Sequence, residues 1–116
     1  ARVAVAARSH EQLAWAKVWG YATEHTAQLK PWLCSYDLVV NTIPACVLGR
    51  EELAALKPGA LVIDLASKPG GVDFDAAARL GVKAFWALSL PGKVAPVTAG
   101  KSIKTTIYNI LTELGV

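Results

Sequence analysis

Three apolar runs of similar length constrain the fold of this chain more than any other feature of its sequence. They begin at Asp37, Ala60 and Val82, about 22 residues apart, and read DLVVNTIPA, ALVIDLASK and VKAFWALSL. Continuous runs of this kind are typical of strands covered on both faces, because a strand with one solvated face alternates apolar and polar residues. A helix-like segment or a chain-breaking residue follows each run. This β-then-α rhythm predicts a parallel sheet with helices on both of its faces.

Further strands and helices fit the same rhythm. RVAVAA, residues 2–7, predicts another buried strand, and residues 21–25 predict a short one. Ser9 followed by Gln12 is a capping-box pattern, which opens a helix that Gly20 closes. Other helices are predicted at residues 50–57, at 74–80 behind a capping Asp73, and at 98–114.

The order of these elements predicts an α/β fold, a Rossmann-like doubly wound parallel sheet flanked by helices. It corresponds to the later part of that fold, because no G-x-G-x-x-G occurs and the first strand with its glycine-rich turn is lacking. We therefore expect residues 1–116 to form a single, partial NAD(P)-binding domain without a substrate domain.

Composition argues against several functional classes. No apolar run approaches the roughly 18 residues that a membrane span needs, and the lysines behind the net charge of +3 are scattered. Cys34 and Cys46 lack metal-ligand spacing and a nearby His, so we expect two reduced thiols. No targeting segment is recognisable. These features predict a soluble, cytoplasmic protein with no metal site and no nucleic-acid or membrane partner.

In an open parallel sheet, ligands bind at the carboxyl ends of the strands. Arg8 and Ser9 follow the first strand, where an acidic residue would bind the ribose hydroxyls of NAD. A guanidinium and a hydroxyl suit the 2′-phosphate of NADP instead, because the fork of Arg matches phosphate oxygens. NADP is thus the predicted cofactor, with NAD as the alternative. An exposed Arg beside a helix cap is the competing interpretation.

Later loops supply the other predicted cofactor contacts. Pro44 holds the loop after the Asp37 run extended, which leaves small and apolar atoms to pack on a ribose or adenine ring. The loop from Ser89 leads to Thr98 at a predicted helix start, whose free N–H groups suit an anion or a carboxamide oxygen. Plain turns are the competing interpretation of such loops. The predicted cofactor-binding residues are Arg8, Ser9, Thr42, Ile43, Pro44, Ala66, Ser67, Leu90, Pro91 and Thr98.

The central run ends in Ser67 and Lys68, ahead of Pro69, Gly70 and Gly71. Two glycines would let the backbone approach a ligand, while the hydroxyl and ammonium groups are donors for a carboxylate, phosphate or carboxamide. Lys68 and Ser67 are therefore the predicted catalytic residues, with a plain tight turn as the alternative. Asp64, within the same run, is expected to satisfy a backbone or loop donor rather than to transfer a proton.

NTIPA, VIDLASKPGGVDF and ALSLPGKVAPVTAG, in this order and spacing, resemble the A subunits of the dipicolinate synthases of spore-forming bacteria. The resemblance covers essentially the whole chain. It implies an NAD(P)-dependent oxidoreductase subunit that works with the flavoprotein-like B subunit of dipicolinate synthase, in the mother cell during sporulation. The implied substrate is a small dicarboxylate, a dihydrodipicolinate-type precursor of pyridine-2,6-dicarboxylate. A homo-oligomer is left open.

Two other interpretations of the sequence stay open. The PG-x-V-x-P-x-T run is similar, more loosely, to methylenetetrahydrofolate dehydrogenases and 2-hydroxyacid dehydrogenases, which supports the class but not the substrate. A non-catalytic dinucleotide-sensing or assembly domain is the alternative from another class. A substrate domain upstream would favour the enzyme, and fusion to a channel or DNA-binding segment would favour the sensor. Without the glycine-rich turn, residues 1–116 alone are expected to be inactive.

Overall fold

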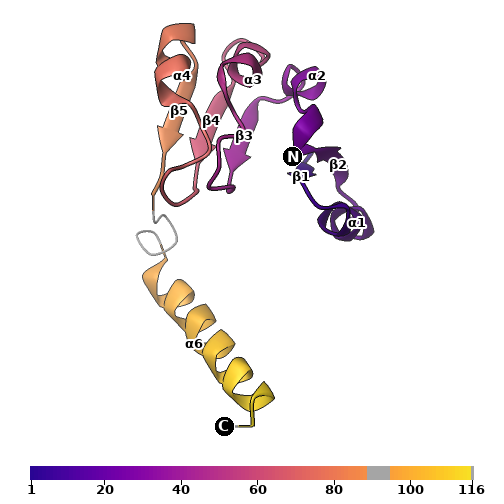
Figure 1. The fold of residues 1–116 in the computed structure, drawn as a ribbon, viewed down its shortest axis with the longest axis vertical. Coiled ribbons are helices and arrows are strands. Elements are labelled where there is room, and N and C mark those ends of the chain that lie inside the picture. The colour runs from indigo at the N-terminus through magenta and orange to yellow at the C-terminus, as the bar shows by residue number, and fades with distance from the viewer. Residues whose placement is uncertain (89–94, 116) are drawn as a thin grey trace.

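The computed structural model describes residues 1–88 and 95–115, which form an α/β structure (Figure 1). The strands are β1 (Ala4–Ala7), β2 (Ala22–His25), β3 (Leu38–Asn41), β4 (Leu61–Asp64) and β5 (Lys83–Trp86). The helices are α1 (His10–Val18), α2 (Lys30–Leu33), α3 (Arg50–Ala54), α4 (Phe74–Leu80) and α6 (Pro96–Glu113), with a 3-10 turn at Thr26–Gln28. Every strand pair is parallel, which confirms the predicted α/β class.

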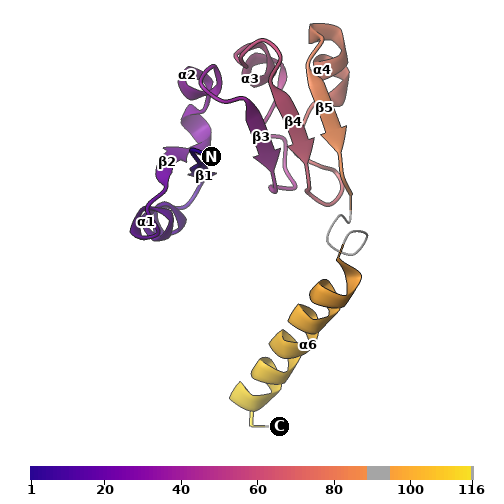
Figure 2. The same cartoon turned by 180° about the vertical axis from the view of Figure 1, so that it is seen from behind.

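The strands form two sheets, whereas the sequence predicts one. β1 pairs with β2, and β3, β4 and β5 form a separate sheet in that order (Figures 1 and 2). In the doubly wound order 3-2-1-4-5-6, strand 1 stands between strands 2 and 4. β1 and β2 match strands 2 and 3, while β3, β4 and β5 match strands 4, 5 and 6. The described residues hold no counterpart of strand 1, so the sheet divides at that place.

Helices cover one face of the three-stranded sheet in the described part of the chain. Val39, Val62 and Ala84 are paired across the sheet, and all three pack into the core beneath the helices. The next row faces the other way, and there Val40 and Phe85 are 49% and 60% exposed. The continuous apolar runs predict cover on both faces. The described helices that pack on this sheet, α3 and α4, cover only one of its faces.

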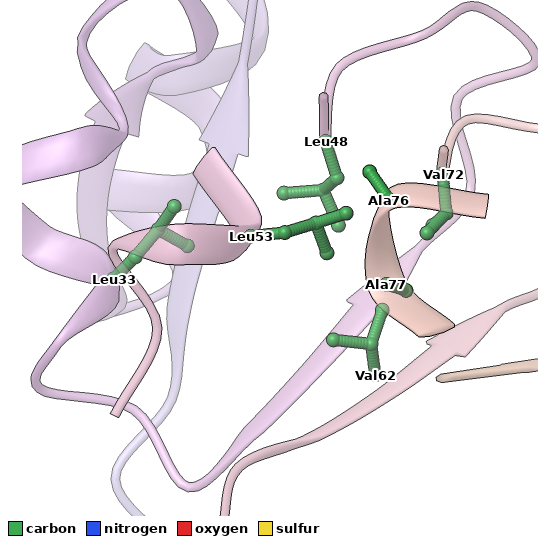
Figure 3. Close-up of a cluster of buried hydrophobic side chains, with 7 residues drawn as sticks. All are labelled: Leu33, Leu48, Leu53, Val62, Val72, Ala76 and Ala77. Atoms are coloured by element: carbon green, nitrogen blue, oxygen red, sulfur yellow. The ribbon is translucent and has the colours of Figure 1, made fainter. Parts of the chain in front are cut away.

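The core lies between β4 and the two helices α3 and α4. Its buried residues are Leu33, Leu48, Leu53, Val62, Val72, Ala76 and Ala77 (Figure 3). Figure 3 shows Val62 of β4 beneath Ala77 of α4, with Leu53 of α3 beside them. Full burial of one Leu or Val side chain contributes about 1.5–3 kcal/mol, so this cluster fixes both helices over β4. The loops that join β3 to α3 and β4 to α4 are thereby held at one edge of the sheet.

Local signals set most helix ends as predicted. Ser9 caps α1, and the Asp73 carboxylate caps α4 by accepting a 3.0 Å hydrogen bond from the Ala76 amide. Gly81 ends α4 in the left-handed conformation, with φ of +70°. α3 is shorter than predicted and ends at Ala54.

Helix α6 begins at Pro96, two residues before the predicted start, because proline is favoured in the first helical turn. It extends away from both sheets in Figures 1 and 2. Ile107, Ile110 and Leu114 are 52%, 49% and 70% exposed, so the predicted apolar face lies uncovered by the described residues. No helix in residues 1–88 or 95–115 has the length and apolar character needed to cross a membrane.

Candidate functional site

The three strands of the larger sheet end in Asn41, Asp64 and Trp86, which are paired with one another across the sheet. We call these three residues the strand-end row. Asn41 is 5% exposed and Asp64 is fully buried, and they are the buried polar side chains of the described residues. Side chains alternate between faces along a strand, so the row lies on the same face as Val62, beneath the helices. A buried carboxylate at this edge requires partners.

Asp64 has three hydrogen-bond donors around its carboxylate. Oδ1 accepts from Asn41 Nδ2 at 2.8 Å and from the Ala66 amide at 3.0 Å. Oδ2 accepts from the Gly71 amide at 2.8 Å. Because every partner is a donor, the acceptor-only carboxylate satisfies all of them. The expectation that Asp64 satisfies loop donors is therefore confirmed.

Asn41 and Trp86 shape the loops on either side of Asp64. Asn41 Nδ2 donates to the Ile43 carbonyl at 2.9 Å, and Asn41 Oδ1 accepts from the Ile43 amide at 3.1 Å. The asparagine side chain thus closes a turn that leaves Thr42 exposed. Trp86 Nε1 donates to the Ala66 carbonyl at 2.9 Å. The strand-end row therefore holds the loop after β3 and the loop after β4.

Gly70 and Gly71 are required by the packing of the protein itself. A Cβ on Gly71 would lie 2.1 Å from Asn41 Nδ2, and one on Gly70 would lie 2.9 Å from Asp64 Oδ2. The Gly70 amide donates to the Ser67 carbonyl at 2.8 Å, and the Gly71 amide donates to Asp64. Both N–H groups are thus already bonded inside the protein, which argues against the prediction that these glycines bring the backbone to a ligand.

Ser67 and Lys68 lie on the exposed tip of this loop, next to a cis Lys68–Pro69 peptide bond. Among the described residues, no hydrogen bond or ion pair involves the Ser67 hydroxyl or the Lys68 ammonium group. Both residues are exposed at the carboxyl end of β4, the edge at which open parallel sheets bind ligands in general. Ala66 is only 3% exposed, and both its backbone polar atoms are bonded within the site. Ala66 supports the loop, and its burial argues against a direct ligand contact.

The other predicted residues lie in several places. Thr42, Ile43 and Pro44 form the loop next to Ser67 and Lys68, held through the strand-end row. Arg8 and Ser9 are exposed at the end of β1, on the other sheet. Thr98 is exposed in the first turn of α6. Leu90 and Pro91 lie outside the described residues.

Neither Asn41 nor Trp86 is among the predicted site residues, although the sequence contains a signal for both. Each is the fourth residue of its strand, the same place that Asp64 has in β4. Alignment of the three apolar runs by their carboxyl ends would have brought these residues into one row. Within the described ranges, no group of three or more His, Cys, Asp or Glu side chains could hold a metal ion. Cys34 and Cys46 are exposed and free.

Parallel β–α units with loops gathered at the strand carboxyl ends are typical of Rossmann-like domains. Similar proteins support the class of a dinucleotide-binding, oxidoreductase-like domain. The chain is 41% identical to the A subunit of dipicolinate synthase from Bacillus subtilis over 114 residues, 98% of this chain. That match covers 38% of the relative, so the chain spans little more than a third of its length. The bifunctional protein FolD 1 of Streptomyces avermitilis is 33% identical over 101 residues, 83% of this chain and 33% of that protein. No protein-family model matches the chain.

Solved structures agree with the sequence comparison. The crystal structure of the dipicolinate synthase A chain from Bacillus subtilis has a TM-score of 0.84 and 41% identity, and covers 99% of this chain and 39% of that chain. The dipicolinate synthase A subunit from Bacillus halodurans has a TM-score of 0.84 and 40% identity, over 96% of this chain and 38% of that chain. The resemblance to the A subunits of dipicolinate synthases is therefore confirmed.

Proposed function

We propose that residues 1–116 are the nucleotide-binding part of an NAD(P)-dependent oxidoreductase subunit that forms pyridine-2,6-dicarboxylate from a dihydrodipicolinate-type precursor. The observation that carries this proposal is the strand-end row of Asn41, Asp64 and Trp86. It holds two loops side by side at the carboxyl edge of a parallel sheet, the place where such folds bind dinucleotides. Similarity to the A subunit of dipicolinate synthase supports the choice of reaction.

In the proposed reaction, the dihydro ring loses one hydride and one proton and becomes the aromatic pyridine dicarboxylate. A bound nicotinamide would accept the hydride, and the proton would pass to solvent. Lys68, exposed at the loop tip, would bind one substrate carboxylate, because an ammonium ion forms a charge-assisted hydrogen bond with it. The Ser67 hydroxyl would orient the nicotinamide carboxamide. The loop at residues 42–44 would offer its apolar atoms to a ribose or adenine ring.

Arg8 and Ser9 favour NADP over NAD in this proposal. Both are exposed where β1 ends, and no acidic side chain stands between β1 and α1. The Ser9 hydroxyl oxygen accepts from the Gln12 amide as the cap of α1, which leaves its hydrogen free to donate to a phosphate. The donor set therefore fits a 2′-phosphate better than an unphosphorylated ribose.

Cofactor titration of the full-length protein tests the proposal. The wild type should bind NADP more tightly than NAD. Arg8→Asp should weaken NADP binding about tenfold or more and NAD binding much less, because a charge-assisted hydrogen bond is worth about 1.5–3 kcal/mol. Arg79→Asp is the matched control, since Arg79 is exposed in the last turn of α4, away from the strand carboxyl ends. An unchanged NADP preference in Arg8→Asp refutes the assignment of Arg8.

We also propose the B subunit of a dipicolinate synthase as the partner, in the cytoplasm of the mother cell, because the relative is one subunit of a synthase. Turnover of the dihydro substrate by the full-length protein with the B subunit would support this. Tight dinucleotide binding without turnover under the same conditions would favour the sensing or assembly role instead.

A further inference from the structure

The Asp64 carboxylate is a buried polar group at the end of β4, and burial of such a group costs free energy unless it is hydrogen-bonded. It is fully buried, and its partners come from two stretches of chain, because Asn41 ends β3 while Ala66 and Gly71 lie in the loop after β4. Loss of the carboxylate would leave these three donors unpaired, so Asp64 contributes to the stability of the fold. The same hydrogen bonds also fix the two stretches of chain relative to each other.

Gly71 is the residue through which this relation extends. Its amide donates to Asp64, and its carbonyl accepts from the Val47 and Leu48 amides at 3.1 and 3.0 Å. Both polar backbone atoms of Gly71 are thus anchored, one to the end of β4 and the other to the segment that enters α3. The loops after β3 and β4 are joined at this point.

The tip of the loop after β4, which carries Ser67 and Lys68, is held by hydrogen bonds on both of its sides. The Gly70 amide donates to the Ser67 carbonyl and closes the turn that carries Lys68, while Trp86 holds the Ala66 carbonyl from β5. The backbone on both sides of Ser67 and Lys68 is therefore fixed, although their side chains are free. Because the backbone is fixed, the Lys68 ammonium group can reach fewer positions, and a charge held near one place can orient a substrate.

We propose that Asp64 is a positioning residue: it sets the Ser67–Lys68 tip relative to the loop of residues 42–44, so that substrate and cofactor contacts form one surface. This inference rests on the proposed function. It assigns Asp64 an effect on catalysis that acts through Lys68, with no contact between Asp64 and the substrate.

The variant Asp64→Asn keeps the shape of the side chain but replaces one acceptor by a donor. One of the three donors then loses its partner and meets an N–H group instead. Asn41 keeps both bonds to Ile43, so the loop of residues 42–44 keeps its turn. We expect the full-length Asp64→Asn protein to bind NADP within threefold of wild type. Its kcat/KM for the dihydro substrate, measured with the B subunit, should fall about tenfold.

A double-mutant cycle separates positioning from a general structural role. If Asp64 acts through Lys68, adding Asp64→Asn to Lys68→Met should lower kcat/KM by less than threefold, because the group that it positions is already absent. The control Gly81→Ala strains the backbone at the end of α4, away from the strand carboxyl ends, and should leave kcat/KM unchanged. An equal loss from Asp64→Asn in both backgrounds overturns the proposal, as does an equal loss from Gly81→Ala.

Amide hydrogen exchange gives a readout that needs no turnover. The Gly71 amide of the full-length protein should exchange at least tenfold faster in Asp64→Asn, while the Ala77 amide, bonded to the Asp73 carbonyl within α4, keeps its rate. Unchanged Gly71 exchange overturns the role of Asp64. A wild type that binds neither NADP nor NAD overturns the proposed function instead, so the two failures are distinguishable.

Discussion

Among the glycines that the structure describes, Gly71 is the one at which an added methyl group, as in Gly71→Ala, would meet the closest contacts. The new Cβ would lie 2.1 Å from Asn41 Nδ2 and 2.5 Å from the Ile43 carbonyl oxygen. Neither atom can retreat easily, since Asn41 is buried and bonded to both Ile43 and Asp64. Either the loop after β4 moves outward or the Asn41 side chain leaves Asp64.

The expected loss combines two effects. Overpacking of this kind costs about 1–3 kcal/mol. Displacing Asn41 from Asp64 leaves buried polar groups unpaired, which costs about 1–3 kcal/mol more. We therefore expect the free energy of unfolding to fall by about 2–6 kcal/mol. With a urea m value of about 2 kcal/mol/M, the unfolding midpoint moves down by about 1–3 M.

The assay is urea unfolding of the full-length protein, followed by tryptophan fluorescence, with two other glycine-to-alanine variants as controls. Gly59 has a φ of +81° with nothing within 4 Å of its Cβ position, so Gly59→Ala should cost only the backbone strain of about 1–2 kcal/mol. Gly100 lies inside α6 with open space around it, so Gly100→Ala should stabilise the helix by about 0.5–1 kcal/mol. A Gly71→Ala variant no less stable than Gly59→Ala would refute the steric argument.

Substitutions at three other sites test separate features. Lys68→Met should leave folding and NADP binding intact but lower kcat/KM, measured with the B subunit, about tenfold or more. A kcat/KM equal to that of the wild type would show that Lys68 is a solvated side chain without a role in substrate binding. Asp73→Ala should cost about 1 kcal/mol in urea unfolding, because α4 loses its N-cap, whereas Asp73→Asn should restore most of that loss. The hydrogen bond and charge of Lys30 hold the pKa of the exposed Glu51 carboxyl below its ordinary value. The stability that this ion pair contributes is therefore present above the unfolded pKa of Glu51 and is lost as pH falls through the folded pKa. NMR titration should show the Glu51 pKa return to its ordinary value in Lys30→Met, and high salt should weaken the shift in wild type.

The features that sequence patterns predict here are those set by neighbouring residues. Asp73 and Gly81 bound α4 through contacts within a few residues, so their side-chain chemistry alone locates both ends. The parallel strands follow from apolar runs separated by helices. The division into two sheets is different, because which strands become neighbours depends on topology rather than on any local run.

Sequence patterns predict the location of the candidate site at the strand carboxyl ends, and that location stays a prediction, but they do not reveal the hydrogen bonds within it. The pair Gly70 and Gly71 indicates a close approach, yet apart from Asp64 the approaching atoms belong to residues of other strands and loops, namely Asn41, Ile43 and Trp86. A sequence pattern indicates that space is needed, and only the packed structure shows what fills it. For the same reason the buried Asp64 was predictable as a satisfied carboxylate, while its three donors were not.

The divided sheet has a consequence for handling this polypeptide. Within the described residues, β1 pairs only with β2 and β3 pairs only with β4, so each has one side whose backbone N–H and C=O groups have no strand beside them. Such unpaired sides are templates on which other chains can add a strand. If residues 1–116 are produced in isolation, self-association through these two sides competes with the monomeric fold. Solubility in such a preparation then reports on exposed strand edges, and a precipitate would carry no information about ligand binding.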